Sequence, residues 1–276
     1  MSEIAGPFHA GPFRRVAEHT YVATAGFSLD GESGEINVGL VVGTEAALLV
    51  DAGGTVDQGR LLREAAAEIT ELPLTTVVLT HGHADHAHGL AGVEAATSIA
   101  HESTRNRLAL DPAAPALPSR VISLAAAIDL GGGVRVEAIY LGRGHTDGDL
   151  VVVVPDVHVV FAGDLVESAG PPQYGPDSYP HEWPATLDGL IGLTLDHSIV
   201  IPGHGPAMNR LEVFEQRSRI AAVSGEMSRL GGLGVSADEA EGRAEWALPF
   251  AAVRQGYAAG VAQAKAATPV RHLPMV

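Results

Sequence analysis

The stretch THGHADHAHG, residues 80–89, constrains this chain strongly, because it places four histidines and an aspartate within ten positions. The chain has 13 histidines among 276 residues, so this density is not a chance scatter. The apolar segment TTVVLT at 75–80 leads into it and predicts a buried strand that ends where the histidines begin. The stretch is therefore either a solvated polar loop or a site that holds metal.

The spacing within this stretch favours a metal site. His81 and His83 are two residues apart, so in an extended chain their side chains leave on the same side. Asp85 and His86 follow one turn later. These two pairs can converge on two adjacent points, but so few ligands do not make a stable site, and more should appear downstream.

Three further candidates do appear downstream, each at the end of an expected strand and beside a glycine. His145 lies in GRGHTDGD, Asp164 in FAGDL and His204 in IPGHGP. Functional side chains gather on loops at strand ends, and glycine lets the backbone turn sharply beside them. We therefore expect these residues to join the histidine-rich stretch, the alternative being a set of unrelated surface or turn residues.

The order of expected elements predicts an α/β protein. Expected strands follow the β-rich first fifty residues at 75–80, 121–124, 134–141, 149–154, 157–162 and 198–202. Expected helices lie at 59–72, 102–110, 185–195 and much of 208–267, and a Pro- and Gly-rich loop occupies 165–183. Two groups of strands with interspersed helices fit two sheets packed face to face with helices outside, although other α/β layouts also fit.

The composition narrows the partners and the compartment. With 17 basic and 33 acidic residues, the formal net charge is −16, which disfavours nucleic acid and anionic membranes as partners. There is no cysteine, so a metal would have to be held by histidine and carboxylate. No secretory signal pattern and no apolar run of about 18 residues is visible, so we expect a cytoplasmic protein.

Together, THGHADHAHG, GHTDGD, FAGD and PGHG, with LLVDAGG upstream, resemble the motifs of the metallo-β-lactamase fold superfamily, in that family's order. The resemblance implies an α/β fold of four layers, an αβ/βα sandwich of two mixed β-sheets with helices on the outer faces. We expect residues 1–276 to form a single domain of this kind, with a mainly helical part from about residue 208.

The resemblance also implies a ligand set of seven residues. A first metal ion would be held by His81, His83 and His145. A second would be held by Asp85, His86 and His204, with Asp164 bridging both. Histidine and carboxylate ligands suit two divalent ions per chain, zinc first, with iron or manganese as alternatives. Asp51, at the end of LLVD, would orient a ligand from behind, unless it is only a turn residue.

The implied function is a hydrolase in which a metal-bound hydroxide cleaves an acyl bond of a small molecule: a thioester, lactone, ester or β-lactam. Asp85 would act catalytically by passing a proton to the leaving group. Two alternatives remain open. One is a mononuclear iron oxidoreductase similar to the persulfide dioxygenases. The other is a non-catalytic metal-binding protein of the same fold, against which the intact ligand set argues.

Several residues near these motifs have no settled role. His88 stands where the family usually has glycine, and we favour a helix residue pointing away over a hydrogen-bond partner behind a ligand. Asp147 and Asp149 are expected to cap the turn at His145 rather than act. Four side chains in the long loop either line a substrate site or pack down as a cover: Tyr174, Tyr179, His181 and Trp183.

Overall fold

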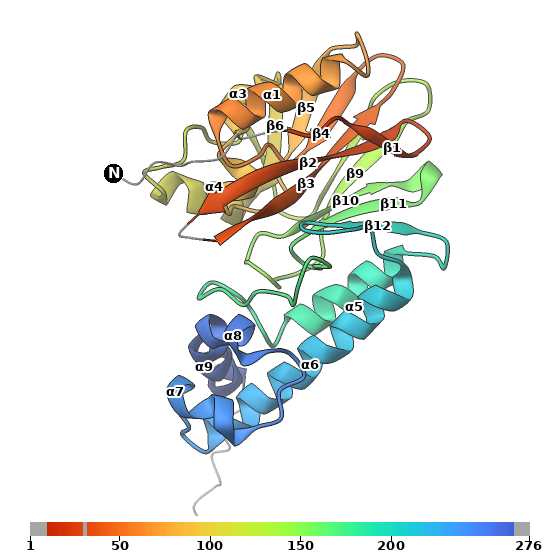
Figure 1. The fold of residues 1–276 in the computed structure, drawn as a ribbon. Coiled ribbons are helices and arrows are strands. Elements are labelled where there is room, and N and C mark those ends of the chain that lie inside the picture. Colours follow the sequence, from red (N-terminus) through yellow and green to blue (C-terminus); the bar gives the residue numbers. More distant parts are fainter. Residues whose placement is uncertain (1–9, 30–31, 268–276) are drawn as a thin grey trace, which may run out of the picture.

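A computed structural model describes residues 10–29 and 32–267, and its strands form two mixed β-sheets that pack face to face (Figure 1). Within these residues the first sheet has seven strands in chain order, β1 (Arg14–Ala17), β2 (Thr20–Leu29), β3 (Glu32–Val42), β4 (Ala47–Val50), β5 (Leu74–Val78), β6 (Thr97–His101) and β7 (Arg120–Ile122). Neighbours are antiparallel from β1 to β4 and parallel from β4 to β7.

The second sheet has the order β12-β11-β10-β9-β8. In the described chain its five strands are β8 (Ala125–Asp129), β9 (Arg135–Tyr140), β10 (Leu150–Val154), β11 (Val159–Gly163) and β12 (Ile199–Pro202). Only the last pair along the chain, β11 and β12, runs parallel, and α5 lies between them in sequence. Strand ends from both sheets are thereby available at one edge of the sandwich.

Helices cover the outer face of each sheet, which gives the four layers predicted from the sequence (Figure 1). The first sheet carries α1 (Val56–Ala67), α3 (Leu90–Val93) and α4 (Glu102–Leu110). The second sheet carries α5 (Trp183–Leu193) and α6 (Arg210–Gly232). The short helix α2 (Ala84–Ala87) contains the second half of the histidine-rich stretch.

Strand β10 shows how the layers follow from the sequence. Val151 and Val153 belong to the apolar core under α5 and α6, whereas Val152 and Val154 belong to the core between the two sheets. A third core lies between the first sheet and its helices. Because β10 is covered on both faces, its sequence is a continuous apolar run rather than an alternating one.

The chain after β12 is helical, as expected from about residue 208. Helix α6 begins at a capping box, in which Asn209 Oδ1 accepts from the Glu212 amide (3.0 Å) and Glu212 Oε2 accepts from the Asn209 amide (2.7 Å). It is followed by α7 (Ala237–Ala240), α8 (Phe250–Val253) and α9 (Tyr257–Ala267). None of the helices among the described residues combines the length and apolar character that a membrane crossing requires.

Some element boundaries differ from the prediction for local reasons. Helix α1 begins at Val56 rather than 59, because Thr55 caps it by accepting from the Gln58 amide (3.2 Å), and it ends before Pro73. The strand predicted at 121–124 coincides with β7 only at Val121 and Ile122, and β8, which begins at Ala125 in the second sheet, was not predicted. Strand β6 was not predicted either, because its sequence TSIAH is neither a continuous apolar run nor a clear alternation.

Candidate metal centre

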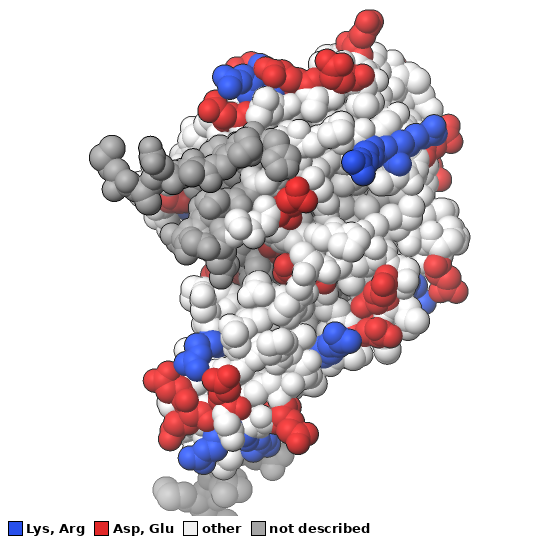
Figure 2. Space-filling model, viewed as in Figure 1, with Lys and Arg blue, Asp and Glu red and all other residues white. Residues whose placement is uncertain are grey.

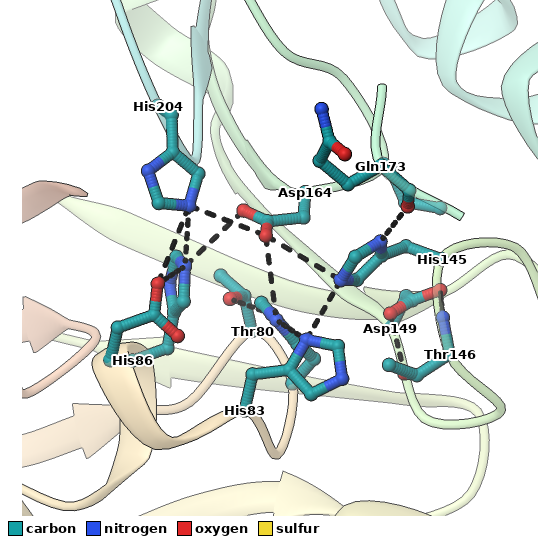
Figure 3. Close-up of polar contacts among 12 residues, drawn as sticks. Thr80, His83, His86, His145, Thr146, Asp149, Asp164, Gln173 and His204 are labelled. Carbon is teal, nitrogen blue, oxygen red and sulfur yellow. Dashed lines mark hydrogen bonds and ion pairs between the residues drawn. The ribbon is translucent and has the colours of Figure 1, made fainter. Parts of the chain in front are cut away.

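The seven candidate ligands lie in segments that follow strands of both sheets, and the structure brings them together in two groups. Figure 3 labels five of them: His83, His86, His145, Asp164 and His204. The histidine-rich stretch follows β5 and continues into α2, which brings His81 and His83 out of the turn and Asp85 and His86 out of the helix. The remaining three follow strands of the second sheet: His145 after β9, Asp164 after β11 and His204 after β12. The two sheets therefore contribute to one site.

The first cluster consists of three imidazoles and one carboxylate. His83 Nδ1 lies 3.1 Å from His81 Nε2 and 2.8 Å from His145 Nε2. Asp164 Oδ2 lies 3.7 Å from His81 Nε2 and 3.5 Å from His145 Nε2. These four atoms surround a single point.

The second cluster consists of Asp85, His86 and His204. His204 Nε2 lies 3.5 Å from both His86 Nε2 and Asp85 Oδ2. Asp164 reaches this cluster as well, because its Oδ1 is 3.2 Å from His86 Nε2 and its Oδ2 is 3.4 Å from His204 Nε2. Asp164 thus lies between the two clusters, at the place where a bridging ligand would be.

Outer hydrogen bonds determine which imidazole nitrogens of the first cluster carry a proton. His145 Nδ1 donates to the Gln173 carbonyl (3.2 Å), because a carbonyl can only accept. His81 Nδ1 donates to Thr80 Oγ1 (3.1 Å), whose own hydrogen goes to Asp51 Oδ2 (2.9 Å). In neutral His81 and His145, Nε2 therefore presents a lone pair to the cluster.

This donor set fits a divalent cation. Even a proton on His83 Nδ1 could satisfy only one of the two facing lone pairs of His81 and His145, whereas a cation among them accepts all three. Asp164 Oδ1 is buried and makes no hydrogen bond to any described residue. Imidazole nitrogens and carboxylate oxygens without thiolates are suitable ligands for zinc, iron or manganese.

Residues 32–204 match the profile of the metallo-beta-lactamase superfamily. The chain belongs to this superfamily. It is 28% identical to metallo-beta-lactamase type 2 of Bacillus sp. (strain 170) over 170 residues, which cover 60% of this chain and 66% of that protein. It is 26% identical to metallo-beta-lactamase type 2 of Bacteroides fragilis over 194 residues, which cover 68% of this chain and 75% of that protein.

Two solved structures show the same fold as this superfamily member. A metallo-beta-lactamase from Pontibacter korlensis has a TM-score of 0.69 at 21% identity, covering 77% of this chain and 99% of that one. A crystal structure of VMB-1 has a TM-score of 0.66 at 22% identity, covering 77% and 97%. The fold and family predicted from the sequence are confirmed, and the relatives support a metal-dependent hydrolase.

Burial and charge act differently on the two clusters of this superfamily member. Burial, followed by the charge of His83, lowers the pKa of His145 to about 4, and burial with His86 lowers the pKa of His81. Burial also opposes charge on His204, but Asp164 outweighs it and raises the pKa of His204 to about 9. For His86, burial is outweighed by Asp164, Asp85 and Asp51, so its pKa is raised as well.

Asp51 lies directly behind His86, as the sequence suggested. Its Oδ2 accepts from His86 Nδ1 (2.8 Å), and its Oδ1 accepts from the Thr80 amide (2.7 Å). Asp51 has a φ of +66°, a left-handed conformation that aspartate tolerates better than most residues. This backbone turn at the end of β4 aims the carboxylate at both the β5 turn and the imidazole.

Asp177 was not singled out from the sequence, although it contacts the first cluster. It lies in the loop between β11 and α5, and its Oδ2 accepts from His83 Nε2 (3.1 Å) and pairs with Arg107. Burial raises the pKa of this carboxyl, but the hydrogen bond from His83 and the charges of His83 and Arg107 outweigh burial and lower it. No motif surrounds Asp177, so only the fold reveals this contact.

The structure also places the residues whose roles the sequence left open. His88 Nε2 pairs with Asp111 Oδ2 (3.0 Å), away from both clusters, so His88 is a hydrogen-bonded residue at the end of α2. Asp149 accepts from the Thr146 amide (2.8 Å) and hydroxyl (2.6 Å), which caps the turn as expected. Burial raises the pKa of Asp149 to about 8.

The four side chains of the long loop that carry rings pack mostly inward. Tyr174 and Trp183 are buried in the core under α5 and α6. His181 Nε2 donates to the Gly260 carbonyl (2.9 Å) in α9. Tyr179 lies under the Arg143 guanidinium, 4.5 Å from the ring centroid. These contacts favour a covering role, and the Trp183 ring also packs beside the candidate ligand His145, with the ring centroids 5.8 Å apart.

Proposed function

We propose that this superfamily member is a dinuclear metal-dependent hydrolase, with zinc as its metal, that cleaves an acyl bond of a small molecule. The bond classes are the thioester, lactone, ester and β-lactam. The observation that carries the proposal is the arrangement of donor atoms. Two complete clusters share Asp164, and in the first cluster the lone pairs of His81 and His145 face His83 Nδ1.

Each part of the ligand set has its own task. His81, His83 and His145 would hold the first ion, Asp85, His86 and His204 the second, and Asp164 would contact both. Two divalent ions supply a nucleophilic hydroxide at neutral pH and polarise the oxygen of the acyl group. Behind the ligands, Asp51 and the Gln173 carbonyl fix the imidazole tautomers.

Asp85 is the residue we assign to proton transfer. Its Oδ2 lies 3.5 Å from His204 Nε2 and 3.7 Å from His86 Nε2, which places this oxygen among the ligand atoms. Its side chain is 15% exposed, against 9% for Asp164, so Asp85 is the more accessible of the two carboxylates. Asp85 Oδ1 would therefore take the proton that the attacking water gives up and pass it to the leaving group of a substrate that arrives from solvent.

Two observations support a small acyl compound as the substrate: the names of the relatives and the net charge of the chain. The relatives from Bacillus and Bacteroides fragilis are named metallo-beta-lactamases, which makes a β-lactam one of the acyl classes to test. A net charge of −16 disfavours nucleic acid and anionic membranes as partners, which leaves a small molecule. Figure 2 shows a hollow between the sandwich and the C-terminal helices, with acidic side chains visible inside it.

The test is metal analysis and turnover on the same preparation. Protein purified without chelator should contain two zinc ions per chain and should hydrolyse at least one substrate in a panel of nitrocefin, thioesters and lactones. Chelator should abolish turnover, and zinc should restore it. A reproducible single iron with no second site on adding zinc would favour a persulfide dioxygenase-like enzyme instead. Two bound ions with no turnover on any acyl substrate would favour a non-catalytic metal-binding protein.

A further inference from the structure

We propose that the helices after β12 position His83 through the loop between β11 and α5, and so set the affinity of the first cluster for metal. Asp177 is the positioning residue in that loop, here called the 165–182 loop. The inference rests on the proposed function, because it takes His83 as a metal ligand. It gives the C-terminal helices a role, although they lie outside the residues 32–204 that match the superfamily.

Asp177 fixes the imidazole of His83 from the side opposite the cluster. His83 Nε2 donates to Asp177 Oδ2 (3.1 Å), so in the neutral ring Nδ1 has the lone pair and faces His81 and His145. Arg107 of α4 pairs with the same carboxylate oxygen. Arg107 therefore helps to hold in place the carboxylate oxygen that accepts from His83.

A tight turn presents Asp177 to His83. The Ser178 amide and hydroxyl both donate to the Gly175 carbonyl, at 3.1 and 2.8 Å. Gly175 packs closely inside this turn, since a Cβ there would lie 2.5 Å from Asp177 Oδ1. The position of Asp177 thus depends on where the Gly175–Ser178 turn is held.

The C-terminal helices hold this turn and the residues around it. Three hydrogen bonds join the loop to α8 and α9: Gln263 Nε2 to the Ser178 carbonyl (3.0 Å), His181 Nε2 to the Gly260 carbonyl (2.9 Å), and the Tyr174 amide to the Ala252 carbonyl (2.9 Å). The Ser224 hydroxyl in α6 also donates to the Pro180 carbonyl. The loop is therefore anchored along most of its second half.

Gly256 lies against the turn with no room for a side chain. It ends a short 3-10 helix, η3 (Arg254–Gly256), that leads into α9. A Cβ at Gly256 would lie 2.7 Å from both Ser178 Oγ and Tyr174 Cβ. A side chain at this position must displace the Gly175–Ser178 turn, and this displacement would move Asp177, which lies within the turn.

The first arm of the test measures metal affinity at Asp177. When the protein competes with a chelator for Co²⁺, the absorption of the protein-bound ion should show two separate binding steps, one for each cluster. Asp177→Ala should weaken the first-cluster step by about 10–100-fold and leave the other step unchanged. Asp177→Asn keeps an oxygen that can accept from His83 and should recover most of the affinity. The control Asp188→Ala, which loses an exposed pair with Arg217 (2.8 and 2.7 Å), should leave both steps unchanged.

The second arm tests the link to the helices. Gly256→Ala should weaken the same step by less than about tenfold, whereas Gly232→Ala, where a Cβ meets nothing within 4 Å, should not. In the Asp177→Ala background Gly256→Ala should add nothing, because it acts through that residue. If Gly256→Ala does not fold, Gln263→Ala takes its place.

Three results are decisive. Loss of the first ion in His83→Ala with none in Asp177→Ala overturns the positioning role and leaves the proposed function intact. An undiminished effect of Gly256→Ala in the Asp177→Ala background overturns the link to the helices. Retention of both ions in His83→Ala overturns the ligand assignment, and with it both the proposed function and this inference.

Discussion

The two ligand clusters are built from the same two kinds of side chain, but they differ in charge. In the first, burial lowers the pKa of His145 to about 4 and keeps its imidazole neutral. In the second, Asp164 outweighs burial and raises the pKa of His204 to about 9. The first cluster therefore offers lone pairs directly, whereas the second must release protons before it can bind a cation.

The clusters also differ in what supports them from behind. Asp51, which holds His86, lies at the end of β4 and is tied to the β5 turn through Thr80. Asp177, which contacts His83, lies in a long loop that the C-terminal helices anchor. The second cluster is thus supported within the sandwich itself, whereas the first is supported partly from within, where Asp51 reaches His81 through Thr80, and partly from outside, where Asp177 contacts His83.

The largest effect is expected from Asp164, which contacts both clusters. Asp164→Ala removes the carboxylate between two cations, so affinity at both sites should fall and turnover should drop by more than about a hundredfold. Metal content is measured by elemental analysis, and turnover with the substrate that the wild-type protein hydrolyses in the panel. The control is Asp196→Ala, which changes an exposed carboxylate. Wild-type metal content and turnover in Asp164→Ala would show that Asp164 is not shared between the two sites.

The difference in charge predicts a difference in pH dependence. Below its pKa of about 9, His204 in the metal-free protein carries a proton that an incoming ion must displace. Affinity at the second site should therefore fall at least about tenfold for each unit that the pH drops between 8 and 6. His145, with a pKa of about 4, is already neutral in this range, so the first site should change less. If chelator competition shows the same change of affinity with pH at both sites, the proposed difference in charge between the two clusters is wrong.

Support from Asp51 should matter most for the second site, because Asp51 contacts His86 directly and reaches His81 only through Thr80. Asp51→Asn keeps the left-handed backbone, which asparagine tolerates, but removes the negative charge behind His86. We expect second-site affinity to fall about 10–100-fold and first-site affinity to fall less. Asp129→Asn, in a turn where Oδ1 accepts from the Gly131 amide, is the matched control. An equal loss at both sites would mean that Asp51 supports the fold in general.

The smallest effect is expected at His88. His88→Ala loses the pairing with Asp111 (3.0 Å) but touches neither cluster. Both ions should stay bound, and activity should change by less than about tenfold, which corresponds to roughly 1.4 kcal/mol. His86→Ala, two residues away, should instead empty or weaken the second site. Comparable metal loss in both variants would show that the register assigned to this stretch is wrong.

The sequence predicted which side chains the fold brings together, but not what stands behind them. Each of the seven lies beside a strand end in a short motif, so local pattern was sufficient. Asp177 has no such motif and reaches His83 only because distant helices hold its loop. Glu35 and Gln173 act on His204 and His145 through backbone carbonyls, which leave no trace in side-chain identity.

The layers were predictable for a related reason. Apolar runs such as that of β10 are long enough to identify a buried strand. Strand β6 has the same length as β10, but Thr97, Ser98 and His101 interrupt its apolar pattern, and it was missed. Strand β8 was also missed, because the sheet to which a short segment belongs depends on distant neighbours. These errors did not affect the prediction of the metal ligands, because none of them concerns a strand whose end carries a ligand.

A crystal structure of the zinc-loaded protein, with anomalous diffraction at the zinc edge, tests the two-metal site most directly. We expect two anomalous peaks, one among His81, His83 and His145 and one among Asp85, His86 and His204, with Asp164 in contact with both. A single peak, or peaks outside these two clusters, would contradict this expectation.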